Sequence, residues 1–272
     1  MPPRIHRSLT GLLALCAALA LPARGAAQDS TAVPLPPSGI RLDLNLPTNQ
    51  LRVYDGDSLV KTYRVSVGLP GHDTPDGRFT VQRAEWNPWW RPPEREWAKD
   101  DKVTPPGPNN PMGRVKLFFA PYYYLHGTPH ERDLGTAASH GCVRMLNRDV
   151  VELGRLLSER ADATVPPSEI TRILASHRNT RWSTFRREIP LTIRYEPVVV
   201  EDGELKVYRD IYRRNRIHTE GVIQALLGAG YDVRGLDRAR VREVLRRAGQ
   251  ARGTYVVKVS EAFGELAMAA GG

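Results

Sequence analysis

Residues 122–145 read YYYLHGTPHERDLGTAASHGCVRM, and this stretch decides both the fold and the chemistry to expect. The aromatic and apolar residues 122–126 predict a strand that ends at His126. Two more histidines and Cys142 follow within the stretch. A thiol is mostly protonated at neutral pH. Cys142 therefore needs a base close by to act as a nucleophile, and imidazole is the usual base.

Small residues around the cysteine favour the close approach of a ligand. Gly141 permits an unusual backbone conformation, so successive N–H groups around Gly141 and Cys142 can point at one oxygen, as acyl transfer requires. Spacing leaves open which histidine is the base. His140 is near Cys142 in sequence but badly placed if the backbone is tight, whereas a returning loop would bring His126 opposite the thiol.

A zinc site is the alternative chemistry for the same residues. His126 and His130 are four residues apart, and His140 and Cys142 add two possible ligands. A glycine and a proline between the first two histidines disfavour the helix that would align them, and the chain has no HExxH motif. We therefore expect no metal and no cofactor.

The pattern outside this stretch is mainly β. Residues 40–46 alternate apolar and polar with the period of a half-buried strand, and Asp55-Gly56 and Asp202-Gly203 are hairpin signals. Asn147 or Asp149 is the expected cap of one helix, and Ser168 of a second. The further expected elements are strands at 51–53, 60–67, 78–83, 115–120, 191–200, 204–208 and 255–259, an irregular segment at 86–113, and helices at 149–160, 168–176, 222–227 and 237–248.

The ends of the chain predict export and two folded parts. Residues 1–27 have the basic start, short apolar run and small residues of a secretory signal, with an uncleaved anchor as the alternative. Residues 28–37 are expected to be a linker, 38–196 a catalytic β domain, and 197–272 a small C-terminal α/β extension. No later segment is apolar enough to span a membrane. Removal of the signal would leave Cys142 as the single thiol.

The composition is that of a globular protein with a basic surface. The formal net charge is +9 and the pI is about 9.8. A basic surface suits anionic partners such as a cell-wall polymer. The sequence has no zinc-finger or RNP-type pattern, so nucleic acid is not an expected partner.

Two motifs in this chain resemble those of the L,D-transpeptidase catalytic domain, the YkuD type of bacterial cell-wall enzymes. The family pattern is a His-Gly pair at a strand end, a variable loop, and then Ser-His-Gly-Cys followed by apolar, Arg and apolar residues. The chain supplies His126-Gly127-Thr128 and residues 139–145, SHGCVRM. Upstream segments at 65–68, 74–77, 87–90 and 105–113 extend the resemblance, which covers roughly residues 40–196. It implies a mainly β, sandwich-like or barrel-like domain with one or two helices.

The resemblance also implies roles for site residues. Cys142 would be the nucleophile, and His126 the general base that raises its thiolate fraction, oriented by the carbonyl of Gly127. The backbone N–H groups of His140, Gly141 and Cys142 would form the oxyanion hole. Ser139 and Arg144 would order the loop, and Arg144 is a candidate contact for a substrate carboxylate.

The implied substrate is the tetrapeptide stem of peptidoglycan, in the periplasm or cell-wall space. Cleavage between a diamino acid and the terminal D-Ala gives a thioester. An amine then attacks it, from another stem in a 3→3 cross-link or from a protein lysine; water as acceptor would make the enzyme an L,D-carboxypeptidase. Such an activity would serve cell-wall biogenesis and cell shape.

Other features keep two interpretations each. The tryptophans of the Pro-rich segment, at positions 86, 89, 90 and 97, either form a lid or wall of the site or simply pack an irregular loop. Arg114 and Lys116 either attract an anionic stem or lie on a solvated strand face, which is the preferred interpretation. Residues 217–272 either pack on the domain, the default, or bind a partner.

Overall fold

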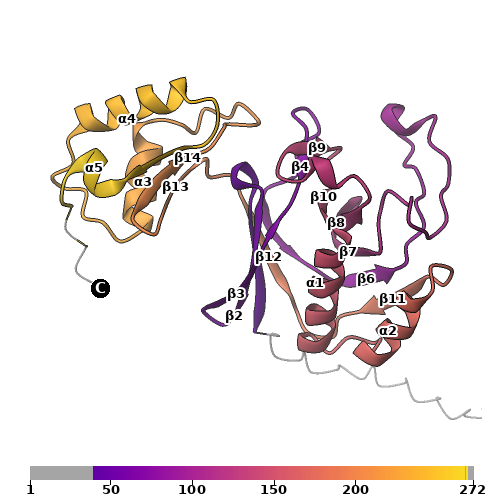
Figure 1. Ribbon diagram of the computed structural model, residues 1–272. Helices are drawn as coiled ribbons and strands as arrows, with labels where there is room; N and C mark the ends of the chain where they lie inside the picture. Colours follow the sequence, from indigo (N-terminus) through magenta and orange to yellow (C-terminus); the bar gives the residue numbers. More distant parts are fainter. Residues whose placement is uncertain (1–38, 267, 269–272) are drawn as a thin grey trace, which may run out of the picture. The chain divides into compact units, whose positions relative to one another are not determined.

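The computed structural model describes residues 39–266 and residue 268 (Figure 1). The expected secretory signal at 1–27 and the whole of the expected linker at 28–37 are not tested by it, because both lie outside the described residues. Within the part that is described, no helix is both long enough and apolar enough to cross a bilayer.

The first sheet is built on the alternating residues that begin the described chain. Its strand order is β3 (Ser58–Arg64), β2 (Gln50–Asp55), β1 (Ile40–Asn45), β12 (Pro190–Arg194) and β5 (Gly77–Thr80). Ile40, Leu42 and Leu44 are buried, as the period of two predicts. Strand β12, about 150 residues later in the chain, pairs in parallel with β1 and joins it to β5 in the same sheet.

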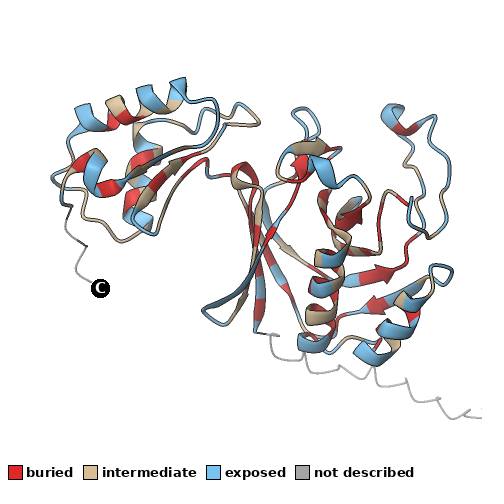
Figure 2. Cartoon of the chain, viewed as in Figure 1, coloured by how far each residue is buried: buried red, intermediate tan, exposed pale blue. Residues whose placement is uncertain are grey.

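The second sheet carries the candidate site. Its order is β10 (Val143–Leu146), β8 (Tyr123–Thr128), β7 (Val115–Ala120), β6 (Arg83–Trp86) and β11 (Arg181–Thr184). Helix α1 (Asn147–Arg160) packs against β7, β8 and β10, and α2 (Pro167–Ala175) follows it. Apolar side chains of both sheets and of α1 share one hydrophobic core (Figure 2). In the short parallel pair β4 (Val67–Gly68) and β9 (Ala137–Ser139), strand β9 ends where the loop that carries Cys142 begins.

A separate core lies in the C-terminal part of the chain. Strands β13 (Val198–Glu201), β14 (Glu204–Val207) and β15 (Tyr255–Lys258) form an antiparallel sheet. Helices α3 (Thr219–Gly228), α4 (Arg238–Gln250) and α5 (Val259–Phe263) accompany it. The buried residues of this part form their own cluster, which includes Val198, Leu205, Leu226 and Val241. The mainly β fold with an α/β C-terminal part is therefore as expected, and its sheets are open.

Several local expectations were wrong. Asn147 lies inside α1 and caps nothing: its Oδ1 accepts from the Arg114 N–H, and its Nδ2 donates to the Thr128 carbonyl. Helix α2 begins at Pro167, one residue before Ser168, with no side-chain cap. The expected strand at 191–200 is two strands, interrupted around Pro197, which has no N–H to donate. The strand at 78–83 is likewise divided between the two sheets.

Candidate active site

Strand β8 places His126 in the second sheet with its imidazole almost wholly buried, 2% exposed. Its Nδ1 lies 2.6 Å from the carbonyl oxygen of Gly127. Only a protonated Nδ1 makes this hydrogen bond, so the carbonyl selects the tautomer whose Nε2 carries a free lone pair. A side chain at position 127 would collide with Asn147, 2.2 Å from the ideal Cβ position, so the site requires glycine there.

The register of the sheet sets His126 in a row of polar neighbours. On β8, His126 pairs with Arg144 of β10 on one side and with Lys116 of β7 on the other, and Lys116 pairs in turn with Glu85 of β6. Residues directly opposite in neighbouring strands lie on the same face. Arg144 and Lys116 therefore flank the imidazole. Lys116 forms a largely buried ion pair with Glu85, with 2.7 Å between Nζ and Oε2.

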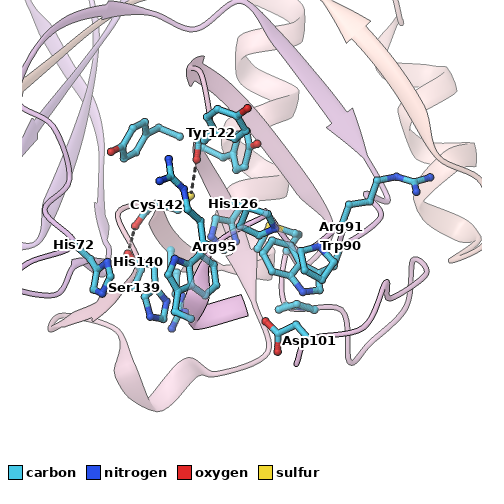
Figure 3. A pocket seen from close by; sticks show the side chains of 18 of the residues that line it. His72, Trp90, Arg91, Arg95, Asp101, Tyr122, His126, Ser139, His140 and Cys142 are labelled. Atoms are coloured by element: carbon cyan, nitrogen blue, oxygen red, sulfur yellow. Dashed lines mark hydrogen bonds between the residues drawn. The ribbon is translucent and has the colours of Figure 1, made fainter. Parts of the chain in front are cut away.

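Cys142 reaches the same pocket from the loop between β9 and β10. Gly141 has a φ of +110°, a conformation that favours glycine, and turns the chain into the cysteine. Cys142 is half-buried as a residue, and its thiol donates to the carbonyl of Tyr122, 3.5 Å away. Figure 3 shows the thiol and His126 facing the same space. The pocket they share has a volume of about 980 Å³.

Burial keeps both reacting groups neutral at rest. Desolvation lowers the pKa of His126 to about 3, an effect that the cations of Arg144 and Lys116 reinforce, although the Gly127 bond opposes it. Desolvation also raises the pKa of Cys142 to about 11, although a backbone hydrogen bond and the same two cations act in the opposite direction. That His126 raises the thiolate fraction of Cys142 stays a prediction, which these pKa directions do not favour for the resting pair. The imidazole is suited instead to take the proton as the sulfur attacks.

Hydrogen bonds hold the loop 139–142 in a fixed shape. The buried Ser139 hydroxyl donates to the Cys142 carbonyl at 2.5 Å and accepts from the Gly141 N–H at 3.1 Å. The Gly141 N–H, one of three expected oxyanion donors, is thus already engaged. The N–H groups of His140 and Cys142 are the remaining candidates.

The imidazole of His140 is committed to the rim of the pocket. It stacks on Trp97 with 4.0 Å between ring centroids and 3° between planes, and meets His72 edge-on at 4.7 Å. Burial, and then the His72 charge, lower its pKa. Of the two candidate bases that spacing left open, we favour His126, because it lines the same pocket as Cys142 and its Nδ1 alone is held by the Gly127 carbonyl.

The Trp-rich segment forms one wall of the pocket but not with all its tryptophans. Trp90 and Trp97 line the pocket, and Trp90 is labelled in Figure 3. Trp86 instead lies fully buried in β6, close against Gly154 of α1. Cations outnumber carboxylates among the lining residues: Arg91, Arg95, Lys102, Lys116 and Arg144 against Asp73 and Asp101.

The contacts of Arg114 and Lys116 indicate different roles for these two basic residues. Arg114 is structural, because its guanidinium donates to Asn87 and to the Leu174 carbonyl. Lys116 lines the pocket, so the preference for a solvated strand face was wrong for it. Sequence reasoning missed its partner Glu85, since the pair depends on the register between β6 and β7. The available signal was the place of Lys116 between the apolar residues Val115 and Leu117, which indicates that its side chain lies on the opposite face from theirs.

Arg144 and His130 complete the predicted residues. Arg144 lines the pocket and lies 3.9 Å from Asp133. His130 lies at the rim, after the end of β8. Among residues 39–266, no three or more His, Cys, Asp or Glu side chains are grouped as metal ligands would be.

Comparison with known proteins gives a consistent picture. Residues 39–166 match the model of the YkuD family, the L,D-transpeptidase catalytic domain. The L,D-transpeptidase homologue YkuD of Bacillus licheniformis is 31% identical over 128 residues, which are 47% of this chain and 66% of that protein. The homologue YbiS of Escherichia coli K12 is 31% identical over 125 residues, 42% of this chain and 41% of that protein. The chain thus spans less than two thirds of the length of either relative.

A solved L,D-transpeptidase from Mycobacterium tuberculosis H37Rv aligns with 57% of each chain at 14% identity, with a TM-score of 0.35. That score is too low to add weight, and the assignment rests on the sequence matches. Residues 39–166 of this chain, which hold the His126 and Cys142 motifs, belong to the YkuD family of L,D-transpeptidase catalytic domains.

Proposed function

We propose that this protein is a cysteine-dependent L,D-transpeptidase that acylates Cys142 with a peptidoglycan tetrapeptide stem and transfers the acyl group to an amine. One observation carries the proposal: His126 and Cys142 line one pocket, and the Gly127 carbonyl leaves the imidazole Nε2 free to face it. The reaction class is acyl transfer, which this pairing of nucleophile and base serves.

The proposed reaction begins with the pair neutral. His126 Nε2 takes the thiol proton as Sγ attacks the carbonyl carbon between the diamino acid and the terminal D-Ala. The N–H groups of His140 and Cys142 stabilise the oxyanion that forms. The C–N bond then breaks, the imidazolium returns its proton to the departing D-Ala amine, and a thioester to Cys142 remains. An acceptor amine repeats these steps in reverse order.

The charge of the pocket suits such a donor. A stem peptide carries carboxylates, and the five cations and two carboxylates that line the pocket give it a net positive potential. Arg144 is the best candidate for direct contact with a carboxylate, because it lies beside the reacting pair and its planar fork matches that group. We place the reaction in the periplasm or cell-wall space, in cell-wall biogenesis.

Product analysis tests the proposal. A defined tetrapeptide donor with a diamino acid side-chain amine as acceptor should give released D-Ala and a 3→3 linked product. His126→Asn should slow this by about 10² or more, because general-base assistance is lost. Undiminished turnover in that variant would assign the base to another group. If the only product is the free tripeptide acid, formed because water rather than an amine attacks the thioester, the enzyme is an L,D-carboxypeptidase.

A further inference from the structure

The C-terminal part of the chain reaches the catalytic loop through one tyrosine. We define the connector as residues 208–216, between β14 and α3. Within it, Ile211 and Tyr212 pack against the core of the two large sheets, not against the C-terminal core. The Tyr212 hydroxyl donates to the Gly68 carbonyl at 3.0 Å and accepts from the Thr74 N–H at 3.1 Å. It thereby ties together both ends of loop 68–74.

Loop 68–74 in turn holds the carbonyls behind the candidate oxyanion hole. The Leu69 N–H donates to the Ser139 carbonyl at 2.9 Å. The buried Thr74 hydroxyl donates to the Gly141 carbonyl, also at 2.9 Å, and accepts from the Gly68 N–H.

The planarity of the peptide bond gives these contacts a consequence at the site. In a trans peptide the C=O and the next residue's N–H point in opposite directions. The Ser139 carbonyl shares a peptide unit with the His140 N–H, and the Gly141 carbonyl with the Cys142 N–H. Loop 68–74 anchors each unit by its oxygen and so fixes the direction of the N–H on its other side.

The connector is itself held rigidly. Arg214 forms ion pairs with Asp73 of loop 68–74 at 3.3 Å and with Asp76, two residues after that loop, at 2.8 Å. Its guanidinium also lies over the rings of Tyr195 and Tyr212, 4.5 and 5.2 Å from the centroids. The Tyr195 hydroxyl accepts from the Tyr212 N–H at 2.8 Å. Both the backbone N–H and the hydroxyl of Tyr212 are therefore held by hydrogen bonds.

We propose that Tyr212 is a positioning residue for acylation, because it fixes loop 68–74 and, through Thr74, the two N–H groups that receive the oxyanion. This role rests on the proposed function of Cys142. It makes the connector part of the catalytic machinery, although it lies outside residues 39–166, which match the family model.

The test compares two reactions of the same sulfur in the full chain. Acylation of Cys142 by imipenem develops negative charge on a carbonyl oxygen, whereas alkylation by iodoacetamide is displacement at an sp³ carbon and needs no oxyanion hole. Tyr212→Phe should slow acylation about tenfold, less than the 10²–10³ lost when a donor is removed outright. It should change alkylation less than about twofold, because the thiol and His126 are unaltered.

Matched variants separate this role from general loss of structure. Tyr208→Phe is the control, since the Tyr208 hydroxyl lies on the same connector and forms no hydrogen bond to any residue in 39–266. It should acylate at the wild-type rate. Thr74→Val should reproduce the defect of Tyr212→Phe, and Thr74→Ser, which keeps the hydroxyl, should restore acylation. The double variant of Tyr212→Phe and Thr74→Val should be no slower than Thr74→Val alone.

Each result decides the proposal. Equal acylation by Tyr212→Phe and wild type overturns it, as does a parallel loss of acylation and alkylation. If Tyr212→Phe does not fold, equal acylation by Thr74→Val and Thr74→Ser overturns it. Failure of the wild type itself to acylate would overturn the proposed function as well, and so is distinguishable from failure of this inference alone.

Discussion

The neutral resting state of the Cys142–His126 pair makes a quantitative prediction about thiol reactivity. With a pKa of about 11, the fraction of Cys142 present as thiolate at pH 7 is about 10⁻⁴. A free cysteine of pKa about 8.5 is about 3% thiolate, roughly 300-fold more. The higher pKa makes each thiolate more nucleophilic by about tenfold, if reactivity follows the usual dependence on thiol basicity. We therefore expect Cys142 to react with iodoacetamide roughly 20- to 30-fold more slowly than free cysteine at pH 7.

The assay is intact-protein mass spectrometry of alkylation between pH 5 and 9, with a cysteine-containing peptide measured beside it. The rate for Cys142 should rise about tenfold per pH unit up to pH 9, since thiolate remains the minor form throughout. A preformed thiolate–imidazolium pair would instead react faster than the peptide at pH 6, at a rate independent of pH. That profile would refute the neutral pair and the concerted proton transfer derived from it.

Three further perturbations test other parts of the site. Lys116→Met should lower the free energy of unfolding by about 3–5 kcal/mol, because it leaves the buried Glu85 carboxylate without its ion-pair partner. Urea titration should show that the double variant Lys116→Met/Glu85→Leu regains stability, and a double variant as unstable as Lys116→Met would contradict the pairing. Gly141→Ala should slow imipenem acylation about 10²-fold or more, because the new Cβ would lie 2.8 Å from Tyr123 on a residue with a φ of +110°. The clash would displace the oxyanion donors, whereas a wild-type rate would show that the loop adapts. The pKa of His126 is lower in the folded than in the unfolded protein, so the neutral imidazole contributes fully to stability above pH 6.5. As the pH falls toward 3, the free energy of unfolding should decline by at most about 1.4 kcal/mol per pH unit. Urea unfolding of His126→Gln should lack this pH-dependent decline, and an identical pH dependence in both proteins would argue against the lowered pKa.

Local patterns predicted the strands that face a core on one side. Ile40, Leu42 and Leu44 alternate over six residues, and their burial follows directly from that alternation. Strands β9, β10 and β11 were not predicted, because each has only three or four residues and no long alternation. Helix α1 was predicted from its apolar face, but not its start, because Asn147 bonds to Arg114 and Thr128 across the fold.

The motifs pointed to Cys142 and His126, which line one pocket, whereas the environment of these two residues depends on contacts distant in sequence. Glu85 becomes the partner of Lys116 only through the register of β6 and β7. Tyr212 meets Thr74 across 138 residues. The raised pKa of Cys142 is likewise a property of burial, which composition and spacing do not describe. The sequence motifs therefore predicted which residues to consider, whereas their burial, charged neighbours and hydrogen bonds follow from the fold.

The most direct measurement is the intact mass of the protein quenched during reaction with a tetrapeptide stem donor. The account predicts a mass increase equal to the stem without its terminal D-Ala, localised to Cys142 by peptide mapping and absent from Cys142→Ala. Release of D-Ala by Cys142→Ala at the wild-type rate would contradict it.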